Sequence, residues 1–171
     1  MLPADMRRKV MDEILFETIR QLSTQFREAC EEYAKETKNQ FFRKFPMYCC
    51  GYASEMLECF LIEKGIRNLR HVIGVKPYTR ASHAWTKLEN GLIIDITLDQ
   101  FSESNPSVYI GKPLPIHNEF CERRERESDS EICNFEVGCF YSSILCIINA
   151  SSEKQNEAKS LQADVASRYE P

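Results

Sequence analysis

The feature that most limits how this chain can fold is a pair of short runs joined by Glu89-Asn90-Gly91. Residues 82–88 and 92–97 are mostly apolar or β-branched, and Asn-Gly is the dipeptide most typical of a tight turn between antiparallel strands. The two runs therefore predict a β-hairpin. Each run also carries one residue that can do chemistry, His83 in the first and Asp95 in the second.

The turn position predicts how the two runs pair. If the turn is centred on Asn90-Gly91, Thr86 lies opposite Asp95 and His83 lies opposite Leu98. His83 and Asp95 are then near the same end of neighbouring strands, a few residues out of direct register. Strand twist or a bulge can bring such side chains together, although spacing alone does not establish a hydrogen bond.

A second constraint comes from the segment 50–65, which begins with a cysteine and ends with Gly65. Apolar residues recur in it at helical spacing, and the terminal glycine is typical of a helix end. Cys50 is thus predicted to open a helix. The unpaired N–H groups and the positive end of the dipole at a helix start favour the thiolate form, which is the nucleophile.

Together the three segments resemble the transglutaminase-like branch of the papain-like cysteine protease superfamily. The matching residues are Cys50 with Ser54 and Gly65-Ile66, then His83-Ala84-Trp85, then Asp95-Ile96-Thr97, within positions 45–101. The resemblance implies an α+β fold in which N-terminal helices and a Cys-bearing helix pack on a mostly antiparallel sheet. It does not extend to the second half of the chain, and a second cysteine precedes the expected nucleophile.

The resemblance also implies a catalytic triad of Cys50, His83 and Asp95. In the family pattern the nucleophile precedes Gly-Ile by fifteen residues, which selects Cys50 over Cys49. A shift of one residue turns a helical side chain by about 100°, so only one of the two cysteines should face His83. Thr97 is expected to support the strand or the aspartate.

These roles predict acyl transfer through a thioester. The Cys50 thiolate would attack a carbonyl carbon, His83 would protonate the leaving group, and Asp95 would orient the imidazole. The expected enzyme is a cysteine hydrolase that cleaves a peptide or amide bond in a peptide or protein substrate. The backbone N–H of Cys50 is a candidate oxyanion donor, with Gln40 or Tyr48 as a candidate side-chain donor.

Other interpretations stay open. The acyl acceptor could be an amine, as in a transglutaminase, or the product could be a deamidated protein, as for an effector delivered into a host. Each residue also has a structural reading, because buried free cysteines are common and usually inert, and a strand histidine or an aspartate at a turn is often structural. A non-enzymatic interaction module that retains the fold is the remaining alternative.

The rest of the chain reads as one domain of 171 residues. A helix is expected over 10–36, with core motifs in 45–101 and a C-terminal extension over 112–171. Strands are expected at 69–75 and 108–111, and the charged segment 121–131 is expected to be a solvated loop or helix face. Periodicity leaves residues 135–148 open between a strand and a buried helix. A polar, helix-prone tail follows from residue 151 to about 166.

Composition excludes several classes of partner. The net charge of −4 and the lack of a basic stripe with aromatic residues predict no nucleic-acid partner. Carboxylates interrupt the N-terminal region and no apolar run reaches about eighteen residues, so neither a secretory signal nor a membrane span is expected. The expected compartment is the cytoplasm, with a secreted effector as the alternative. The oligomeric state cannot be read from the sequence.

The eight cysteines include an adjacent pair and lack the spacing of a disulfide framework, so reduced thiols are expected. No C-x-x-C motif occurs, and His117 with Cys121 forms only half of a zinc site. The sequence therefore predicts neither a metal nor a cofactor.

Overall fold

The computed structural model describes residues 3–129 and 135–168, so Cys133 lies outside the described part. The fold is α+β, as expected. Its elements are α1 (Ala4–Glu36), α2 (Cys50–Glu63), β1 (Leu69–Val75), β2 (Ser82–Leu88), β3 (Ile93–Asp95), β4 (Tyr109–Gly111), α3 (Pro115–Glu119), β5 (Glu122–Glu127) and α4 (Phe135–Arg168), with short 3-10 turns at Phe42–Lys44 and Leu98–Gln100. The five strands form one sheet in the order β4-β3-β2-β1-β5, and every neighbouring pair is antiparallel.

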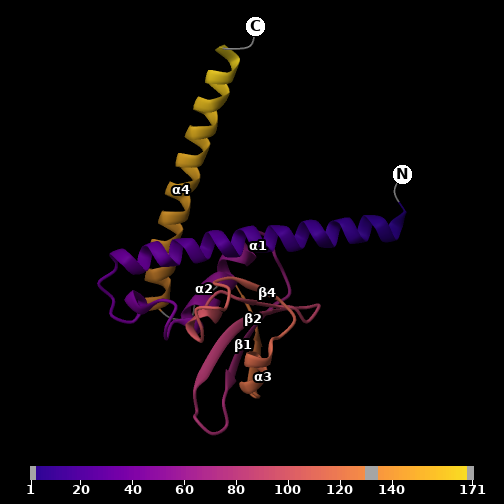
Figure 1. Ribbon diagram of the computed structural model, residues 1–171, viewed down its shortest axis with the longest axis vertical. Helices are drawn as coiled ribbons and strands as arrows, with labels where there is room; N and C mark the ends of the chain where they lie inside the picture. Colours follow the sequence, from indigo (N-terminus) through magenta and orange to yellow (C-terminus); the bar gives the residue numbers. More distant parts are fainter. Residues whose placement is uncertain (1–2, 130–134, 169–171) are drawn as a thin grey trace.

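Three helices make the layer above the sheet, where α1 and α4 cross over α2 (Figure 1). The main core lies between them and is rich in aromatic side chains: Phe26 of α1 contacts Phe60 of α2 and Tyr141 of α4 at ring-centroid distances of 5.3 and 6.4 Å. The question left open for 135–148 is thereby settled as helix, and the polar tail continues the same helix to Arg168.

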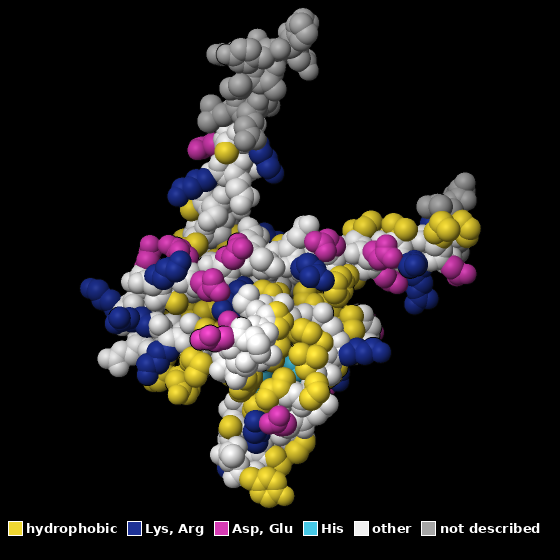
Figure 2. Space-filling view, viewed as in Figure 1, with side chains coloured by type: hydrophobic (Ala, Val, Ile, Leu, Met, Phe, Trp, Pro, Cys, Tyr) yellow, Lys and Arg dark blue, Asp and Glu magenta, His cyan; other side chains and the backbone are white. Residues whose placement is uncertain are grey.

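The predicted N-terminal helix covers the core only along part of its length. Ile19, Phe26 and Cys30 are buried, whereas the first turns of α1 extend beyond the body of the protein. Apolar side chains are exposed there, as the yellow surface at the N-terminal end of the helix shows in Figure 2. None of the described helices carries an apolar stretch long enough to cross a bilayer.

The hairpin forms, but its predicted register is wrong by one residue. Thr86 lies opposite Ile94, not opposite Asp95. The reason is the turn: Gly91 donates its N–H to the carbonyl of Leu88, and Leu88 donates to the carbonyl of Leu92, so the loop has three residues instead of two. Gly91 has φ +82°, the left-handed conformation that ends such a three-residue loop and that glycine adopts without strain.

This shift decides which face of the sheet Asp95 occupies. Side chains alternate between faces along a strand, and residues directly opposite each other share a face. When the observed pairing is continued by one residue, Asp95 falls opposite Trp85, and His83 lies two residues from Trp85 on the same face. In the expected register Asp95 would have shared the face of Thr86 instead. The three-residue loop is therefore what makes His83 and Asp95 diagonal neighbours.

The face of the sheet that carries Thr86 is fixed to α2 by polar contacts. Glu58 of α2 is buried and its Oε1 accepts a hydrogen bond from Thr86 Oγ1 at 2.9 Å and contacts His71 Nδ1 at 2.9 Å. Its other oxygen accepts from Ser128 Oγ at 2.8 Å. One turn earlier in the helix, Ser54 Oγ donates to the carbonyl of Ala84 at 3.1 Å. These contacts set the position of α2 along β2, next to His83.

The prediction of a loop or helix face for the segment 121–131 is wrong for Glu122–Glu127, which form edge strand β5. All six residues are exposed and charged, so the sequence lacks the alternation of apolar and polar residues that is typical of a strand. Backbone pairing with β1 and charge pairs across the strands hold it instead, including Lys87 with Glu125 and Arg70 with Glu127. Residues 130 and 131 lie outside the described part.

A second, smaller core lies on the face of the sheet that carries Trp85. It consists of Val72, Trp85, Ile93 and Phe120, with Phe120 directly following α3. Phe120 comes unusually close to β1 at Gly74, where a Cβ atom would stand 2.6 Å from Phe120 Cβ and 2.8 Å from its carbonyl oxygen. The absence of a side chain at Gly74 is thus what lets the end of α3 pack onto the sheet.

Substitution of Gly74 by Ala is expected to lower the free energy of unfolding by about 1–3 kcal/mol, because the added methyl group overlaps backbone and Cβ atoms that cannot move independently. Urea unfolding followed by circular dichroism measures this. Gly138→Ala is the matched control: it lies in α4, where an added methyl group would meet no atom within 4 Å, and should be neutral or stabilising. Equal stability of the two variants would contradict the close packing at Gly74.

Candidate functional site

Cys50 is the first residue of α2, and its side chain is partly exposed. Cys49 is the N-cap residue and no side chain caps this helix, while the first intrahelical bond runs from Ala53 N–H to the carbonyl of Cys49. The backbone N–H groups of the first turn therefore have no acceptor within the helix. They point toward the region of the thiol with the positive end of the helix dipole, a setting suited to an anion.

Cys49 faces elsewhere, as expected from the helical rotation. Its side chain is fully buried, and its Sγ donates to the carbonyl of Phe41 at 3.4 Å. Burial, together with the neighbouring Cys50, raises the pKa of the Cys49 thiol to about 11. At neutral pH Cys49 is therefore a poor nucleophile, and of the adjacent pair only Cys50 is placed to react.

His83 lies at the start of β2 and its Nε2 is 2.6 Å from Asp95 Oδ2, with both side chains inaccessible to solvent. Burial alone lowers the pKa of the imidazole, but hydrogen bonds to Asp95 and Cys50 and the charges of both residues outweigh it and raise this pKa to about 9. Because Nε2 is engaged by Asp95, Nδ1 is the nitrogen that faces Cys50. The structure thus brings all three predicted residues together.

Aromatic rings enclose the imidazole of His83. The ring of Phe101 meets it edge-on at 4.8 Å between centroids, and Phe120 and Trp85 lie at 5.5 and 5.6 Å. In Figure 2, histidine is visible only as a small patch framed by apolar side chains. This apolar wall lowers the local dielectric, which strengthens the interaction of the imidazolium with its partners.

Asp95 accepts hydrogen bonds from Thr97 as well as from His83. Its Oδ1 accepts from the backbone N–H of Thr97 at 2.9 Å and from Thr97 Oγ1 at 3.2 Å. Burial raises the pKa of this carboxyl, but hydrogen bonds from His117 and His83, the His83 charge and the Thr97 N–H outweigh it and lower the pKa to about 2. Asp95 is therefore ionised at neutral pH, and Thr97 supports the aspartate, which is one of its two expected roles.

His117 is the first of two residues at this site that the sequence did not identify. It lies in α3, fully buried, with Nε2 3.1 Å from the same Asp95 oxygen that contacts His83. The sequence indicated it only as half of a zinc site with Cys121, which is exposed. No local motif marks His117, since it follows Asp95 by 22 residues and lies beyond the segment covered by the family resemblance.

Gln100 is a second contact that the sequence missed. Its Nε2 donates to the carbonyl of Thr97 at 2.8 Å and lies 3.3 Å from His83 Nδ1, the nitrogen that faces Cys50. The candidate donors Gln40 and Tyr48 instead line a separate surface pocket with aromatic neighbours. Within the described residues, no hydrogen bond joins either of them to the triad.

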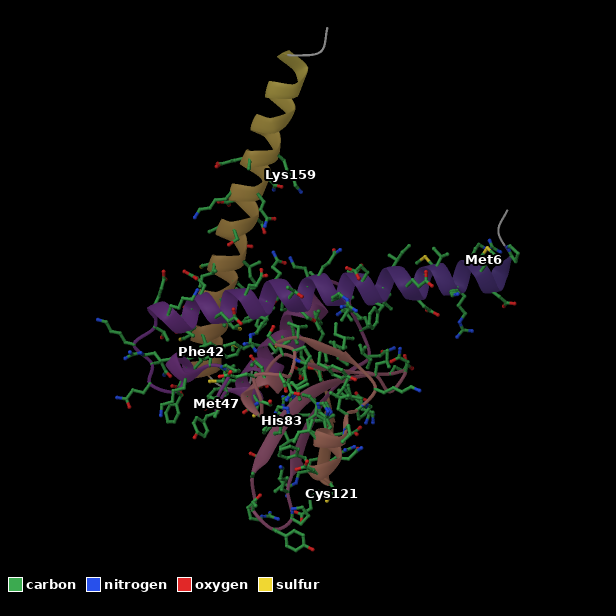
Figure 3. All side chains as sticks on the ribbon, viewed as in Figure 1. Met6, Phe42, Met47, His83, Cys121 and Lys159 are labelled. Atoms are coloured by element: carbon green, nitrogen blue, oxygen red, sulfur yellow. The ribbon has the colours of Figure 1, made fainter. Side chains whose placement is uncertain are left out.

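An open groove of about 680 Å³ begins at Gln100. Pro46 and Met47 form one wall, just before the Cys50 helix, and residues 99–107 form the other. Met47, one of the lining residues, is labelled in Figure 3 together with His83. Gln100 lines this groove and its Nε2 lies 3.3 Å from His83 Nδ1, so the groove borders the candidate site.

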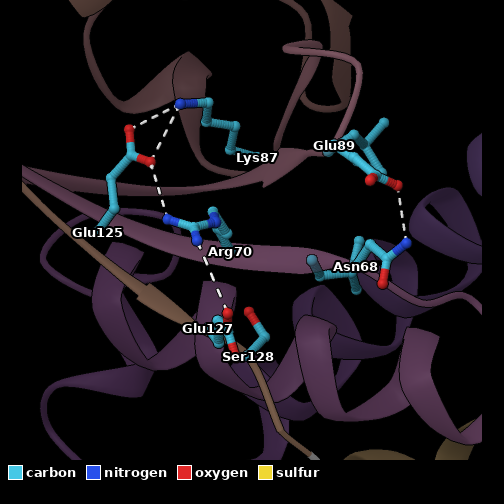
Figure 4. Close-up of a pocket in the computed structure, with 9 residues that line it drawn as sticks. Asn68, Arg70, Lys87, Glu89, Glu125, Glu127 and Ser128 are labelled. Atoms are coloured by element: carbon cyan, nitrogen blue, oxygen red, sulfur yellow. Dashed lines mark hydrogen bonds and ion pairs between the residues drawn. The ribbon is translucent and has the colours of Figure 1, made fainter.

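A charged surface pocket elsewhere belongs to no such arrangement. It lies over β1, β2 and β5, where Lys87 and Arg70 pair with Glu125 and Glu127 (Figure 4). The paired charges satisfy one another, and no described cysteine or histidine lines this pocket.

The residue types around Asp95 are also those of a metal site. The ligand atoms of His83, Asp95 and His117 lie within 4.8 Å of one another, the one such cluster in the described chain. Both histidines, however, stand at hydrogen-bonding distance from one oxygen, and His117 Nδ1 already accepts the N–H of Leu114 at 3.1 Å. Nε2 of His117 must then carry a proton, which is incompatible with metal ligation through that atom.

Comparison of the chain with protein-family models, with curated proteins and with solved structures finds no match. The site itself combines a partly exposed thiol at a helix N-terminus, a buried imidazole that holds a proton at neutral pH, a carboxylate bound by two histidines, and an adjacent groove.

Proposed function

We propose that this protein is a thiol-dependent acyl-transfer enzyme with a transglutaminase-like or papain-like fold, and that it hydrolyses a peptide or amide bond. The observation that carries the proposal is the environment of His83, whose imidazole interacts with Asp95 on one side and with Cys50 on the other. A thiol next to a base that is oriented by a carboxylate is activated as a nucleophile.

The fold supports the family resemblance. A helix that starts at the cysteine packs on an antiparallel sheet, with the histidine on one strand and the aspartate at the end of the next. The three proposed catalytic residues thus come from three separate elements. This arrangement agrees with what the resemblance of the three motifs implies.

The proposed reaction begins with the Cys50 thiolate paired with protonated His83. The sulfur attacks the carbonyl carbon of the substrate, and the carbon–nitrogen bond breaks as His83 Nδ1 donates its proton to the leaving amine. His83 then removes a proton from water as its oxygen attacks the thioester carbon, and the carbon–sulfur bond breaks. The acid leaves, and the Cys50 thiolate is restored beside protonated His83. Asp95 stabilises the imidazolium and keeps the ring oriented with Nδ1 toward the sulfur.

The oxyanion that forms in each step requires donors. The backbone N–H of Cys50 is available at the helix start. Gln100 is the proposed side-chain donor, because one of its amide hydrogens is directed to the carbonyl of Thr97 while its nitrogen lies 3.3 Å from His83 Nδ1. Because Nδ1 of protonated His83 carries its own hydrogen, the second amide hydrogen can be directed to a substrate oxygen.

Mass spectrometry with an activated acyl donor, p-nitrophenyl acetate, tests the proposal. The parent protein should acquire an acetyl group on Cys50 and lose it to water, and Cys50→Ala should abolish turnover. Cys49→Ala is the matched control and should retain the rate within about twofold, because its buried thiol faces Phe41.

The outcomes separate the alternatives. Transfer of the acyl group to an added alkylamine in preference to water would replace the hydrolase by a transglutaminase. A thiol at Cys50 that reacts no faster than in a His83→Ala variant would overturn the enzyme proposal and leave an interaction module with this fold.

A further inference from the structure

We infer that His117 is a positioning residue of the site: as a neutral donor at Nε2 it holds Asp95 in place, and through Asp95 it sustains the proton on His83. The role of His117 in catalysis rests on the proposed function, whereas its hydrogen bonds to Asp95 and Leu114 do not depend on that function. The inference assigns a role to a residue outside the triad and outside the segment that carries the family resemblance.

The two contacts of the His117 ring determine its protonation state. Nδ1 is 3.1 Å from the backbone nitrogen of Leu114, which can only donate, so Nδ1 must accept. A neutral imidazole has one donor and one acceptor, so the hydrogen is on Nε2 and points to Asp95 Oδ2 at 3.1 Å. The ring is therefore a donor to Asp95 without adding a charge to the site.

Protonation of both nitrogens would disrupt this arrangement. A hydrogen on Nδ1 would face the N–H of Leu114, leaving two buried donors opposed and unsatisfied. His117 thus differs from His83, which contacts Asp95 through Nε2 but faces a thiol through Nδ1. One carboxylate serves two histidines, and only His83 is placed to gain and lose a proton.

Several contacts hold the His117 ring where it is. Arg123 of β5 donates to the carbonyl of His117 at 2.9 Å and to that of Phe120 at 3.1 Å, which pins the short helix α3. Tyr109 of β4 stacks on the ring at 6.0 Å between centroids, and Trp85 meets it edge-on at 5.2 Å. The segment after the family motifs therefore delivers a fixed donor into the centre of the site.

The predicted consequence concerns His83. Without the His117 donor, Oδ2 of Asp95 is bound by His83 alone, and the carboxylate is both less stabilised as an anion and freer to rotate. The freedom to rotate weakens its hold on the imidazolium, because the oxygen is no longer fixed opposite His83 Nε2. The charged and titratable groups that pack around this cluster are Cys50 from α2, Tyr109 from β4 and Arg123 from β5, which lies over the Trp85 ring. None of them replaces the lost donor, since the Tyr109 hydroxyl donates to the carbonyl of Lys112.

Two substitutions separate the donor function from local structure. The side-chain amide of His117→Asn reaches the position of Nδ1, so it can accept from Leu114, but it is too short to reach Asp95. The amide of His117→Gln extends to the position of Nε2 and can donate to Asp95. The pair therefore differs mainly in the contact under test.

The experiment is an NMR titration of His83 combined with the rate of iodoacetamide alkylation at Cys50, in the parent and both variants. His117→Asn should lower the His83 midpoint by about one pH unit and slow alkylation at pH 7 by about tenfold. His117→Gln should stay within about threefold of the parent. Urea unfolding of the two variants checks that both are folded.

Unchanged His83 titration in a folded His117→Asn variant would overturn the inference, as would equal losses in both variants. Loss of the parent's Cys50 reactivity on treatment with a zinc chelator would also overturn it, because His117 would then be a ligand. None of these readouts uses an acyl donor, so failure of the acyl-transfer test with a shifted His83 would remove the proposed function and leave the positioning role intact.

Discussion

An Asp95→Asn variant is expected to remain folded and to lose about four orders of magnitude in the rate of thioester formation and turnover. An asparagine retains the shape but carries no charge, so it no longer stabilises the imidazolium of His83. Its amide group also offers donors toward His83 and His117, both of which donate to Asp95 in the parent. His83 is then driven to the tautomer with hydrogen on Nδ1, which cannot accept a proton from Cys50.

The kinetics of acetyl transfer from p-nitrophenyl acetate measure this loss. Thr97→Val is the control, since it removes only the Thr97 hydroxyl contact of 3.2 Å and keeps the backbone N–H contact of 2.9 Å. It should lower the rate by less than about tenfold. A loss of less than about tenfold in Asp95→Asn itself would contradict the role of the carboxylate.

The His83–Asp95 pair also predicts how the stability of the protein depends on pH. Because the folded pKa of His83 is raised to about 9, its contribution is complete below the unfolded value of about 6.5 and is lost as the pH rises through 9. The contribution of Asp95, with its pKa lowered to about 2, is present above about 3.9 and is lost as the pH falls toward 2. Urea unfolding at pH 6 and pH 9.5 should therefore show a loss in the parent that is smaller in Asp95→Asn.

An Arg27→Met variant is expected to lose about 2–4 kcal/mol of unfolding free energy. Arg27 of α1 is buried and bridges to Asp99 with two hydrogen bonds of 2.7 and 2.9 Å, to Glu31 at 2.8 Å and to the carbonyls of Ile96 and Ser107. Methionine fills much of the volume but leaves these acceptors without a donor. The carbonyl of Ile96 is buried and would lose a donor that water cannot replace, whereas Asp99 and Glu31 are partly exposed and can be hydrated.

Chemical denaturation measures the loss, and Arg20→Met is the control. Arg20 is exposed, and its ion pair with Glu17 at 3.5 Å should contribute within about 0.5 kcal/mol. Arg27 also holds the segment that carries Thr97 and Gln100, so the His83 titration should change in Arg27→Met. Equal stability of the two variants would show that the hydrogen bonds from Arg27 of α1 to the segment after β3 do not hold the site together.

Much of the fold could be predicted because its signals are local. The helix over 10–36, the helix from Cys50 and the strand over 69–75 rest on hydrophobic periodicity and end signals that lie within each segment. Cys50, His83 and Asp95 could be named because each lies within a short motif. Their proximity depended on the hairpin, whose existence is a local property.

The parts that could not be predicted depend on tertiary contacts. Strand β5 has no apolar alternation and is defined by its partner β1, so its sequence reads as a solvated segment. His117 joins the site only because Phe120 packs against Gly74 and Arg123 holds α3. Gln100 enters through a 3-10 turn after Thr97. No spacing rule links these residues to Asp95 before the chain is folded.

The three-residue loop of the hairpin has a consequence for how sequences with this site can vary. Ile93 and Ile94 lie in the two separate cores on opposite faces of the sheet, and because both are isoleucine, packing alone barely distinguishes one register from the other. What distinguishes them is whether Asp95 meets two histidines or lies beside Thr86 and the buried Glu58 of α2. If the turn keeps its three-residue geometry, a deletion or insertion of one residue between Leu88 and Leu92 shifts the pairing by one and moves the carboxylate to the other face of the sheet. A change of two residues returns the carboxylate to the face of His83, displaced along the strand. The face that Asp95 occupies therefore follows the parity of the number of residues in this segment.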